Sequence, residues 1–150
     1  MKPVLKAALI GGLFSGALDI AAASVFFHAS PGRVLQAVAA GFYGKDSFTM
    51  GAASMVVGAA AQEAITVVAA LLYCLMAQRV SLLLRQWIVC GLLYGAVCNL
   101  VMTFVVVPFA SHARPTPFGS TGFWVNLAIN TALYGTPIAY AARRYLRAGQ

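Results

Sequence analysis

Four long apolar runs dominate this sequence. They lie at about Val4–Phe27, Met50–Ala77, Trp87–Phe109 and Phe123–Ala142, and Pro, Gly, Ser or basic residues separate them. A bilayer core about 30 Å thick requires about 20 mostly apolar residues in one helix. Within lipid, only helices and closed barrels satisfy all of their backbone hydrogen bonds. The sequence therefore predicts an all-α, polytopic membrane protein with four transmembrane helices, built as a single domain over residues 1–150.

The composition indicates that lipid, rather than water, is the main solvent of the chain. Hydrophobic residues make up 61% of it and charged residues only 9%, far outside the range of soluble proteins. The net charge of +7 is also typical of nucleic-acid-binding proteins, but these basic residues are divided among the termini and short connections instead of following one helix face. We therefore expect membrane lipids, and no nucleic acid, as partners.

The basic residues also predict the orientation of the chain, because short cytoplasmic loops are enriched in Lys and Arg. With four spans, three basic residues fall on one side of the membrane: Arg33, Lys45 and Arg114. Seven fall on the side of the termini and the 78–86 connection: Lys2, Lys6, Arg79, Arg85, Arg143, Arg144 and Arg147. Both termini are therefore predicted to be cytoplasmic, in a bacterial inner membrane.

The start of the chain is compatible with two interpretations. The segment Met1–Lys6, followed by an apolar stretch, is typical of a cleavable signal peptide. The apolar run nevertheless continues to Phe27 and contains Asp19 in its second half. We therefore expect the first span to be retained.

A shorter helix is predicted between the first two spans. Ser30 is a favourable N-cap residue, and Pro31 is a favourable first helical residue. The apolar residues that follow recur at helical spacing: Val34, Leu35, Val38 and Phe42. A helix at about 31–42 is too short to cross a membrane, so we expect it to be interfacial or re-entrant.

Polar residues at the outer face are further candidates for binding. Arg33 and Lys45 are suited to a phosphate headgroup. His28 and His112 are both expected at this face, but the sequence offers no second pair of metal ligands at a suitable spacing. The outer-face candidates are therefore His28, Arg33 and Lys45, and no metal site is expected.

Two G-x-x-x-G motifs, Gly12/Gly16 and Gly91/Gly95, lie in segments that resemble each other, Gly12–Ala17 and Gly91–Ala96. The similarity indicates a weak repeat of two helical hairpins. Glycines at this spacing let helix backbones approach closely within lipid. The motifs predict either a homodimer interface or close packing inside one bundle.

The most informative residues are the polar ones within the apolar runs: Asp19, Gln62, Glu63, Asn99, Asn126 and Asn130. An ionised carboxylate near the bilayer centre is costly, so it faces the protein interior, pairs with another group or takes up a proton. The helical rise allows one polar layer through all four helices. We predict a site for a proton, a cation or a small solute, in which Asp19 and Glu63 are the acids. Its neutral ligands are Gln62, Asn99 and Asn130. The alternative is a structural hydrogen-bond network that holds the helices together.

Motifs for catalysis are missing from the sequence. It contains no nucleophile elbow, zinc-protease helix, Walker loop or Gly-rich dinucleotide turn. Its three cysteines lie within apolar runs and have no disulfide or metal-ligand spacing. We expect no cofactor and no catalytic residue, and the sequence gives enzymatic activity little support.

Several segments resemble a loosely defined group of small, mostly uncharacterised bacterial inner-membrane proteins, to which the YagU-like proteins are distantly similar in layout. The resemblance is carried by these segments: Gly12–Asp19, Pro31–Gln36, Gly41–Gly44 and Gly91–Gly95. It covers most of the length, although YagU-like proteins have a longer first outer segment. The resemblance implies a bacterial inner-membrane location and this topology, and it implies no particular chemistry.

Three functions follow from these features. The first is a small channel or transporter that binds its substrate at the Asp19/Glu63 layer. Because four short helices rarely enclose a pathway alone, it is expected to act as a homo-oligomer. The second is a non-transporting accessory or scaffold subunit of a larger membrane complex, which docks through its G-x-x-x-G motifs. The third is a membrane enzyme that acts on lipid near the outer 28–48 segment.

Overall fold

The computed structural model describes residues 2–112 and 116–147, and within these residues it contains helices and no β-strand. Three helices are long and apolar enough to cross a membrane: Pro3–Phe26, Ala52–Arg79 and Trp87–Phe109. The first two are α1 (Pro3–Phe26) and α3 (Ala52–Arg79). The third consists of α5 (Trp87–Val101), the π-helical segment η2 (Met102–Val106) and α6 (Val107–Ala110). The all-helical class predicted from the sequence is therefore confirmed.

The fourth apolar run, at about 123–142, is helical throughout. It consists of α7 (Thr121–Ile129), the π-helical segment η3 (Asn130–Tyr134) and α8 (Gly135–Leu146). It is not among the three helices that are apolar enough to span a membrane. The apolar run is interrupted by Asn126, Asn130 and Pro137, which lower its hydropathy.

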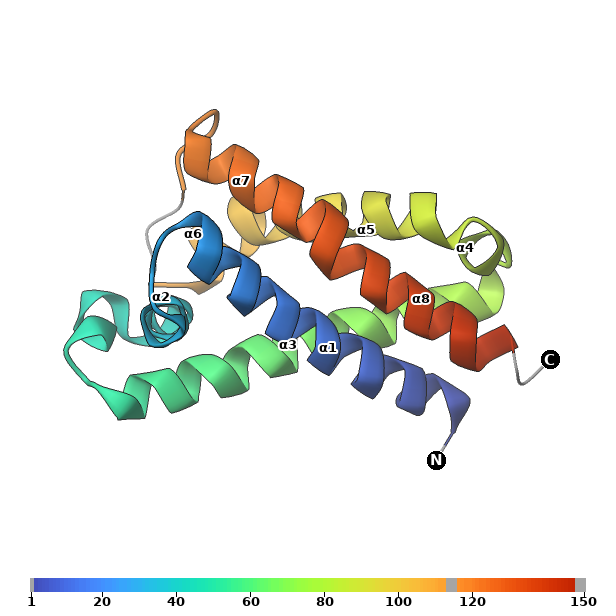
Figure 1. Ribbon diagram of the computed structural model, residues 1–150, viewed down its shortest axis with the longest axis horizontal. Helices are drawn as coiled ribbons and strands as arrows, with labels where there is room; N and C mark the ends of the chain where they lie inside the picture. Colours follow the sequence, from blue (N-terminus) through green and yellow to red (C-terminus); the bar gives the residue numbers. More distant parts are fainter. Residues whose placement is uncertain (1, 113–115, 148–150) are drawn as a thin grey trace.

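The long helices alternate in direction along one common axis (Figure 1). α1 packs between α3 and α8, and α8 packs in turn on α5. The described ends of the chain lie at the same end of this bundle, which we call the terminal end. The opposite end, which we call the loop end, carries α2 and the connection that follows α6 (Figure 1).

Three short helical elements connect the long helices: α2 (Pro31–Tyr43), the 3₁₀ helix η1 (Gly44–Phe48) and α4 (Leu82–Arg85). Ser30 caps α2, because its Oγ accepts a hydrogen bond from the Arg33 backbone N–H at 3.3 Å. α2 packs closely on α3, where a Cβ added to Gly58 would overlap the Leu35 backbone carbonyl. The His112 N–H donates to the Gly41 carbonyl at 2.9 Å and ties the connection after α6 to α2.

Small side chains fill the bundle near the terminal end. Its buried cluster comprises Ala7, Ala8, Ala70, Tyr73, Cys74, Ala77, Leu84, Tyr134, Ile138, Ala139, Ala142 and Leu146. Alanines let the helices approach closely where lipid offers no hydrophobic drive for association. The Tyr73 hydroxyl donates to the Leu83 carbonyl at 3.0 Å, so the polar end of this large buried side chain is satisfied.

Both G-x-x-x-G motifs make contacts between helices of one chain. A Cβ added to Gly12 would lie 2.6 Å from the Val67 Cα of α3. A Cβ added to Gly91 would lie 3.0 Å from the Gly135 carbonyl oxygen, and one added to Gly95 would overlap the carbonyl oxygen of Asn130. The first motif therefore joins α1 to α3, and the second joins α5 to the α7–η3–α8 helix.

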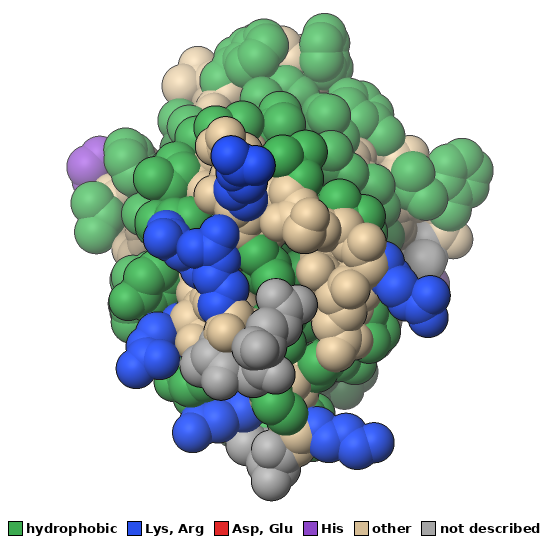
Figure 2. Space-filling model, turned by 90° about the vertical axis from the view of Figure 1, so that its right-hand side faces the viewer, with side chains coloured by type: hydrophobic (Ala, Val, Ile, Leu, Met, Phe, Trp, Pro, Cys, Tyr) green, Lys and Arg blue, Asp and Glu red, His purple; other side chains and the backbone are tan. Residues whose placement is uncertain are grey.

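Charge is distributed unequally between the two ends. The terminal end carries seven Lys or Arg and no Asp or Glu among the described residues: Lys2, Lys6, Arg79, Arg85, Arg143, Arg144 and Arg147. Lys and Arg side chains are spread over this end, and no acidic side chain is visible there (Figure 2). The loop end carries Arg33, Lys45 and Asp46, and Arg114 lies outside the described residues.

Candidate functional site

A polar cavity of about 230 Å³ lies in the half of the bundle nearest the loop end. Its polar lining residues are Asp19, Gln62, Asn99, Thr103, Thr116, Asn126 and Asn130. Each long helical stretch contributes at least one of them. One water needs only about 10–15 Å³ of such volume, so this cavity is large enough for a small hydrated group. Four of the five predicted ligands therefore lie together.

The carboxylate of Asp19 is held by its neighbour on α3. Gln62 Nε2 donates a hydrogen bond to Asp19 Oδ2 at 2.7 Å. Gln62 is buried, and it joins α1 to α3 at the wall of the cavity. The bond orients the carboxylate but brings no positive charge, and no Lys or Arg is among the described lining residues. A cation or a hydrogen-bond donor inside the cavity would find a suitable partner in Asp19.

Asn99 supplies a second hydrogen-bond acceptor. It is only 5% exposed, and its Oδ1 has no hydrogen-bond partner among the described residues. An unsatisfied buried amide oxygen costs about 1–3 kcal/mol. Asn99 is also among the residues that line the cavity, although its Oδ1 is itself buried.

Two wide helical turns form part of the cavity wall. Met102 and Thr103 belong to the π-helical segment η2, and Asn130 and Tyr134 belong to η3. Each segment is followed closely by a proline, Pro108 after η2 and Pro137 after η3. Proline lacks an N–H and collides with the carbonyl one turn earlier, which explains why the regular helix is interrupted at these places. Segments of this kind are frequent at functional sites.

Backbone contacts hold the second of these segments in place. Ser15 Oγ donates a buried hydrogen bond to the Tyr134 carbonyl at 3.0 Å. Asn130 Nδ2 donates to the Asn126 carbonyl at 3.0 Å, within its own helix. In the structure, the irregular segment before Pro137 lines the cavity.

Glu63, the other predicted acid, does not line the cavity. Its carboxylate lies over Gly16, where an added Cβ would approach both carboxylate oxygens to 2.8 Å. Glu63 Oε2 has no hydrogen-bond partner among the described residues. Successive helical residues point about 100° apart. Gln62 therefore faces the cavity while Glu63 faces the α1–α3 contact, and only one of the two predicted acids lines the cavity.

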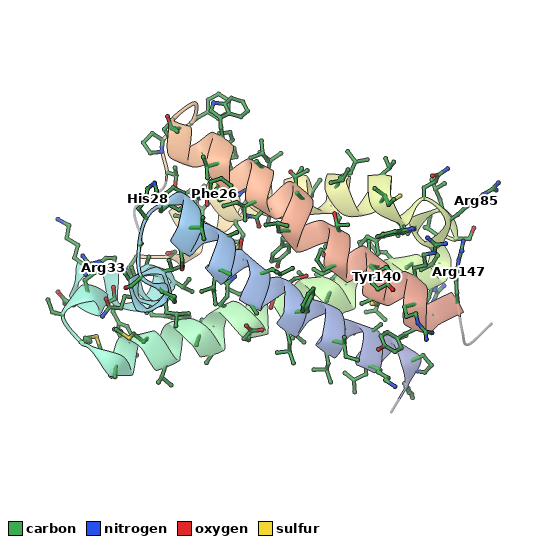
Figure 3. The ribbon with its side chains drawn as sticks, viewed as in Figure 1. Phe26, His28, Arg33, Arg85, Tyr140 and Arg147 are labelled. Carbon is green, nitrogen blue, oxygen red and sulfur yellow. The ribbon has the colours of Figure 1, made fainter. Side chains whose placement is uncertain are left out.

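The outer-face candidates lie at the loop end, and none of them lines the polar cavity. Figure 3 shows His28 and Arg33 at the loop end, far from Arg85 and Arg147. The Arg33 guanidinium lies 4.3 Å from the centre of the Phe48 ring, and Lys45 is exposed. His28 occupies a turn with a positive φ of 49°. Among the described residues, no group of three or more His, Cys, Asp or Glu could hold a metal ion.

Several lining residues were not predicted as ligands, although their spacing could have revealed them. Thr103 follows Asn99 by four residues, and Asn126 precedes Asn130 by four. Residues four apart lie on one face of a helix. A search for polar pairs at this spacing would have found both. Thr116 carries no such signal, because it lies in the irregular connection after α6.

Comparisons with models of protein families, with curated proteins and with solved structures gave no match. The assignment of a function therefore depends on the residues of this chain. The arrangement described above has the composition of a binding site, with one carboxylate, several amides and hydroxyls, and helix backbones that depart from regular geometry.

Proposed function

We propose that this chain is a small integral membrane protein that crosses a bacterial inner membrane four times, with both termini in the cytoplasm. It binds a small cation or a hydrogen-bonding solute in the Asp19 cavity and moves it across the membrane as a transporter or channel. The observation that carries this proposal is the cavity itself, which gathers Asp19, Gln62, Asn99 and Asn130 from four helical stretches.

The chemistry of the lining supports a cationic or donating substrate. Asp19 is the only acidic or basic side chain among the described lining residues, and the amide side chains of Gln62, Asn99, Asn126 and Asn130 line the same cavity. Polar residues within membrane spans are costly, and they commonly mark the path of an ion or substrate. An anion in the cavity would instead be repelled by the Asp19 carboxylate, because no Lys or Arg is among the described lining residues.

The proposed topology rests on lengths and charges. Three helices are long and apolar enough to cross a membrane. The segment Thr121–Leu146 is helical throughout and packs beside them, so we propose that it is the fourth span. The seven basic residues of the terminal end favour the cytoplasmic side for both termini. A fluorescent protein that folds only in the cytoplasm, fused after Gln150, will fluoresce if this orientation is right and remain dark if it is reversed.

Oligomer formation is part of the proposal, because four short helices enclose only a limited path. Both G-x-x-x-G motifs pack inside one chain, so the contact between copies would use other faces of the helices. Native mass spectrometry of the protein released from lipid nanodiscs measures the number of copies. A purely monomeric species would contradict this part of the proposal.

Flux into liposomes tests the function. Proton, sodium, potassium and ammonium flux is compared between the wild type and Asp19→Asn at equal incorporation. Asparagine has nearly the same side-chain shape as aspartate and can still accept the hydrogen bond from Gln62, but it carries no charge. A charge-assisted hydrogen bond contributes about 1.5–3 kcal/mol, so flux of the transported ion should fall at least about tenfold.

Asp46→Asn is the matched control, because Asp46 lies in η1 at the loop end and does not line the cavity. Flux through this variant should equal that of the wild type. If all three proteins are equally silent, transport of these ions is contradicted, and the accessory-subunit interpretation becomes the better account. Co-purification from native membranes would then identify the partner.

A further inference from the structure

A long apolar groove of about 530 Å³ adjoins the polar cavity on the side where α3 faces α5. On α3 it is lined by Ile65, Val68 and Leu72, among others, and on α5 and η2 by Val97, Val101 and Met102. With a rise of about 1.5 Å per residue, the stretch from Ile65 to Leu72 extends about 10 Å along the helix. This length is comparable to that of an extended octyl chain.

The cavity and the groove share part of their walls. Ile65, Cys98, Met102 and Tyr134 line both of them. These shared side chains lie between the polar space and the apolar one, and Met102 has a flexible, unbranched side chain that adapts readily to a ligand. The groove is open at the surface that faces lipid, since Val68 is 56% exposed and Val101 is 45% exposed.

A hydrogen bond holds the two walls of the groove together near the terminal end. The Tyr94 hydroxyl donates to the Ala69 carbonyl at 2.7 Å, and the Tyr94 ring packs against Tyr73 with centroids 5.0 Å apart. These contacts fix the part of the groove that is nearer the terminal end. The part nearer the loop end lies beside the polar cavity. A polar compartment next to an apolar channel of this length matches the two parts of an amphiphile.

The charge of the residues that line the cavity determines which class of amphiphile fits the cavity and the groove. Among the described lining residues, the cavity offers Asp19 as its only charge beside several neutral amides, and it offers no Lys or Arg. We propose that the ligand is an amphiphilic primary ammonium compound, whose head enters the Asp19 cavity and whose alkyl chain lies in the groove between α3 and α5. This inference rests on the proposed function and names the class of solute that the same site takes.

Cys98 provides a direct reporter, because it lines both compartments. Cys90 lies about two turns earlier on the same helix and lines neither, so it is an internal control for non-specific effects. The wild-type protein in phosphatidylcholine nanodiscs is treated with N-ethylmaleimide, and the alkylation of each cysteine is followed by peptide mass spectrometry. Octylammonium should slow alkylation of Cys98 at least about fivefold, since a site occupancy above about 80% leaves less than about 20% of the sites free. The rate at Cys90 should not change.

Matched ligands separate the contributions of charge and chain. Butylammonium at the same concentration should protect Cys98 weakly, because it lacks the chain that fills the groove. Octanoate should not protect it, because its head is an anion. Octyltrimethylammonium should protect less than octylammonium, because it has no N–H to donate to the Asp19 carboxylate. Protection by octylammonium should be lost in Asp19→Asn.

Two further variants test the groove itself. Val101→Trp places a large ring in the groove and should abolish the preference for octylammonium over butylammonium. Val89→Trp is its control, because Val89 is also on the exposed face of α5 but lies outside the groove. The Tm provides a measurement that needs no cysteine. Octylammonium should raise the Tm of the wild type and leave that of Asp19→Asn unchanged.

The outcomes distinguish the two proposals. Equal protection by butylammonium and octylammonium, lost in Asp19→Asn, would overturn the amphiphile inference and retain the small-cation site. Equal protection by octanoate and octylammonium would overturn it in favour of simple filling of an apolar groove. If octylammonium neither protects Cys98 nor changes the Tm, the amphiphile inference is contradicted. The ion-flux measurement would still test the proposed function independently.

Discussion

Near the terminal end, the helices of this protein meet through alanine and glycine, whereas near the loop end they leave a polar cavity between them. The terminal half contains a continuous buried cluster in which Ala7, Ala70 and Ala139 are fully buried. The loop half contains η2, the buried Asn99 and the carboxylate of Asp19, and η3 lies at the boundary, since its Tyr134 belongs to the buried cluster and also lines the cavity. The same helices build both halves.

The difference suggests a division between a half of the bundle that provides stability and a half that contains the proposed binding site. Close contact between small residues stabilises helix pairs in lipid. Polar groups in a cavity contribute less to stability unless their hydrogen bonds are satisfied, and here one of them is not. We infer that the terminal half maintains the bundle and that the loop half supplies recognition. Three substitutions test this division.

The largest effect is expected for Gly91→Leu in the packed half. A Cβ at Gly91 would already lie 2.9 Å from Ala139 Cβ, and the leucine side chain would separate α5 from α8. The free energy of unfolding should fall by about 3 kcal/mol, at the upper end of the cost of overpacking. Reversible unfolding in mixed detergent micelles, followed by circular dichroism, measures the change.

Val97→Leu on the same helix is the control for this substitution. Val97 is 53% exposed, so the larger side chain has room, and the free energy of unfolding should change by no more than about 0.5 kcal/mol. If Gly91→Leu unfolds as the wild type does but loses a dimer, the motif joins two copies, and the packed half would have to be reinterpreted.

A smaller effect is expected for Ser15→Ala, at the boundary between the halves. The substitution removes the hydrogen bond from Ser15 Oγ to the Tyr134 carbonyl, which fixes η3 to α1. The free energy of unfolding should fall by about 1 kcal/mol, because a buried hydrogen bond makes a modest net contribution. Ser15→Thr, which retains the hydroxyl, should restore part of this loss unless its extra methyl group is not accommodated. An unchanged stability in Ser15→Ala would show that η3 does not depend on this contact.

The smallest effect is expected for Thr136→Val in α8, and its sign is opposite. Thr136 Oγ1 is buried without a hydrogen-bond partner among the described residues. Valine replaces the hydroxyl with a methyl group of similar size, so the free energy of unfolding should rise by about 0.5 kcal/mol. Thr136→Ser keeps the hydroxyl and should show no gain. A loss of stability in Thr136→Val would indicate that this hydroxyl has a role in the packed half.

The helical architecture could be predicted from the sequence because lipid leaves the backbone few alternatives. Apolar runs of sufficient length identify the three helices that can cross a membrane. The fourth run is helical, but Asn126 and Asn130 reduce its hydropathy, and its role as a span stays a prediction.

The candidate site could be predicted only in part. The presence of polar residues in apolar runs pointed to Asp19, Gln62, Asn99 and Asn130, which line one cavity. The direction of each side chain depends on helix rotation, which the sequence does not specify, and so Glu63 was grouped with Asp19 although it faces Gly16. The groove between α3 and α5 arises from the separation of two helices, and no single residue in the sequence indicates it.

The π-helical segments also affect how substitutions in one half of the bundle influence the helix faces in the other half. A π turn contains one residue more than an α turn, so it rotates the following helix by about 100° relative to a regular continuation. Residues of α7 and α8 therefore do not share one helical wheel, although they form one unbroken stretch. Substitutions accumulated in the loop half can alter the face that α7 presents while the alanine face of α8 keeps its register against α1.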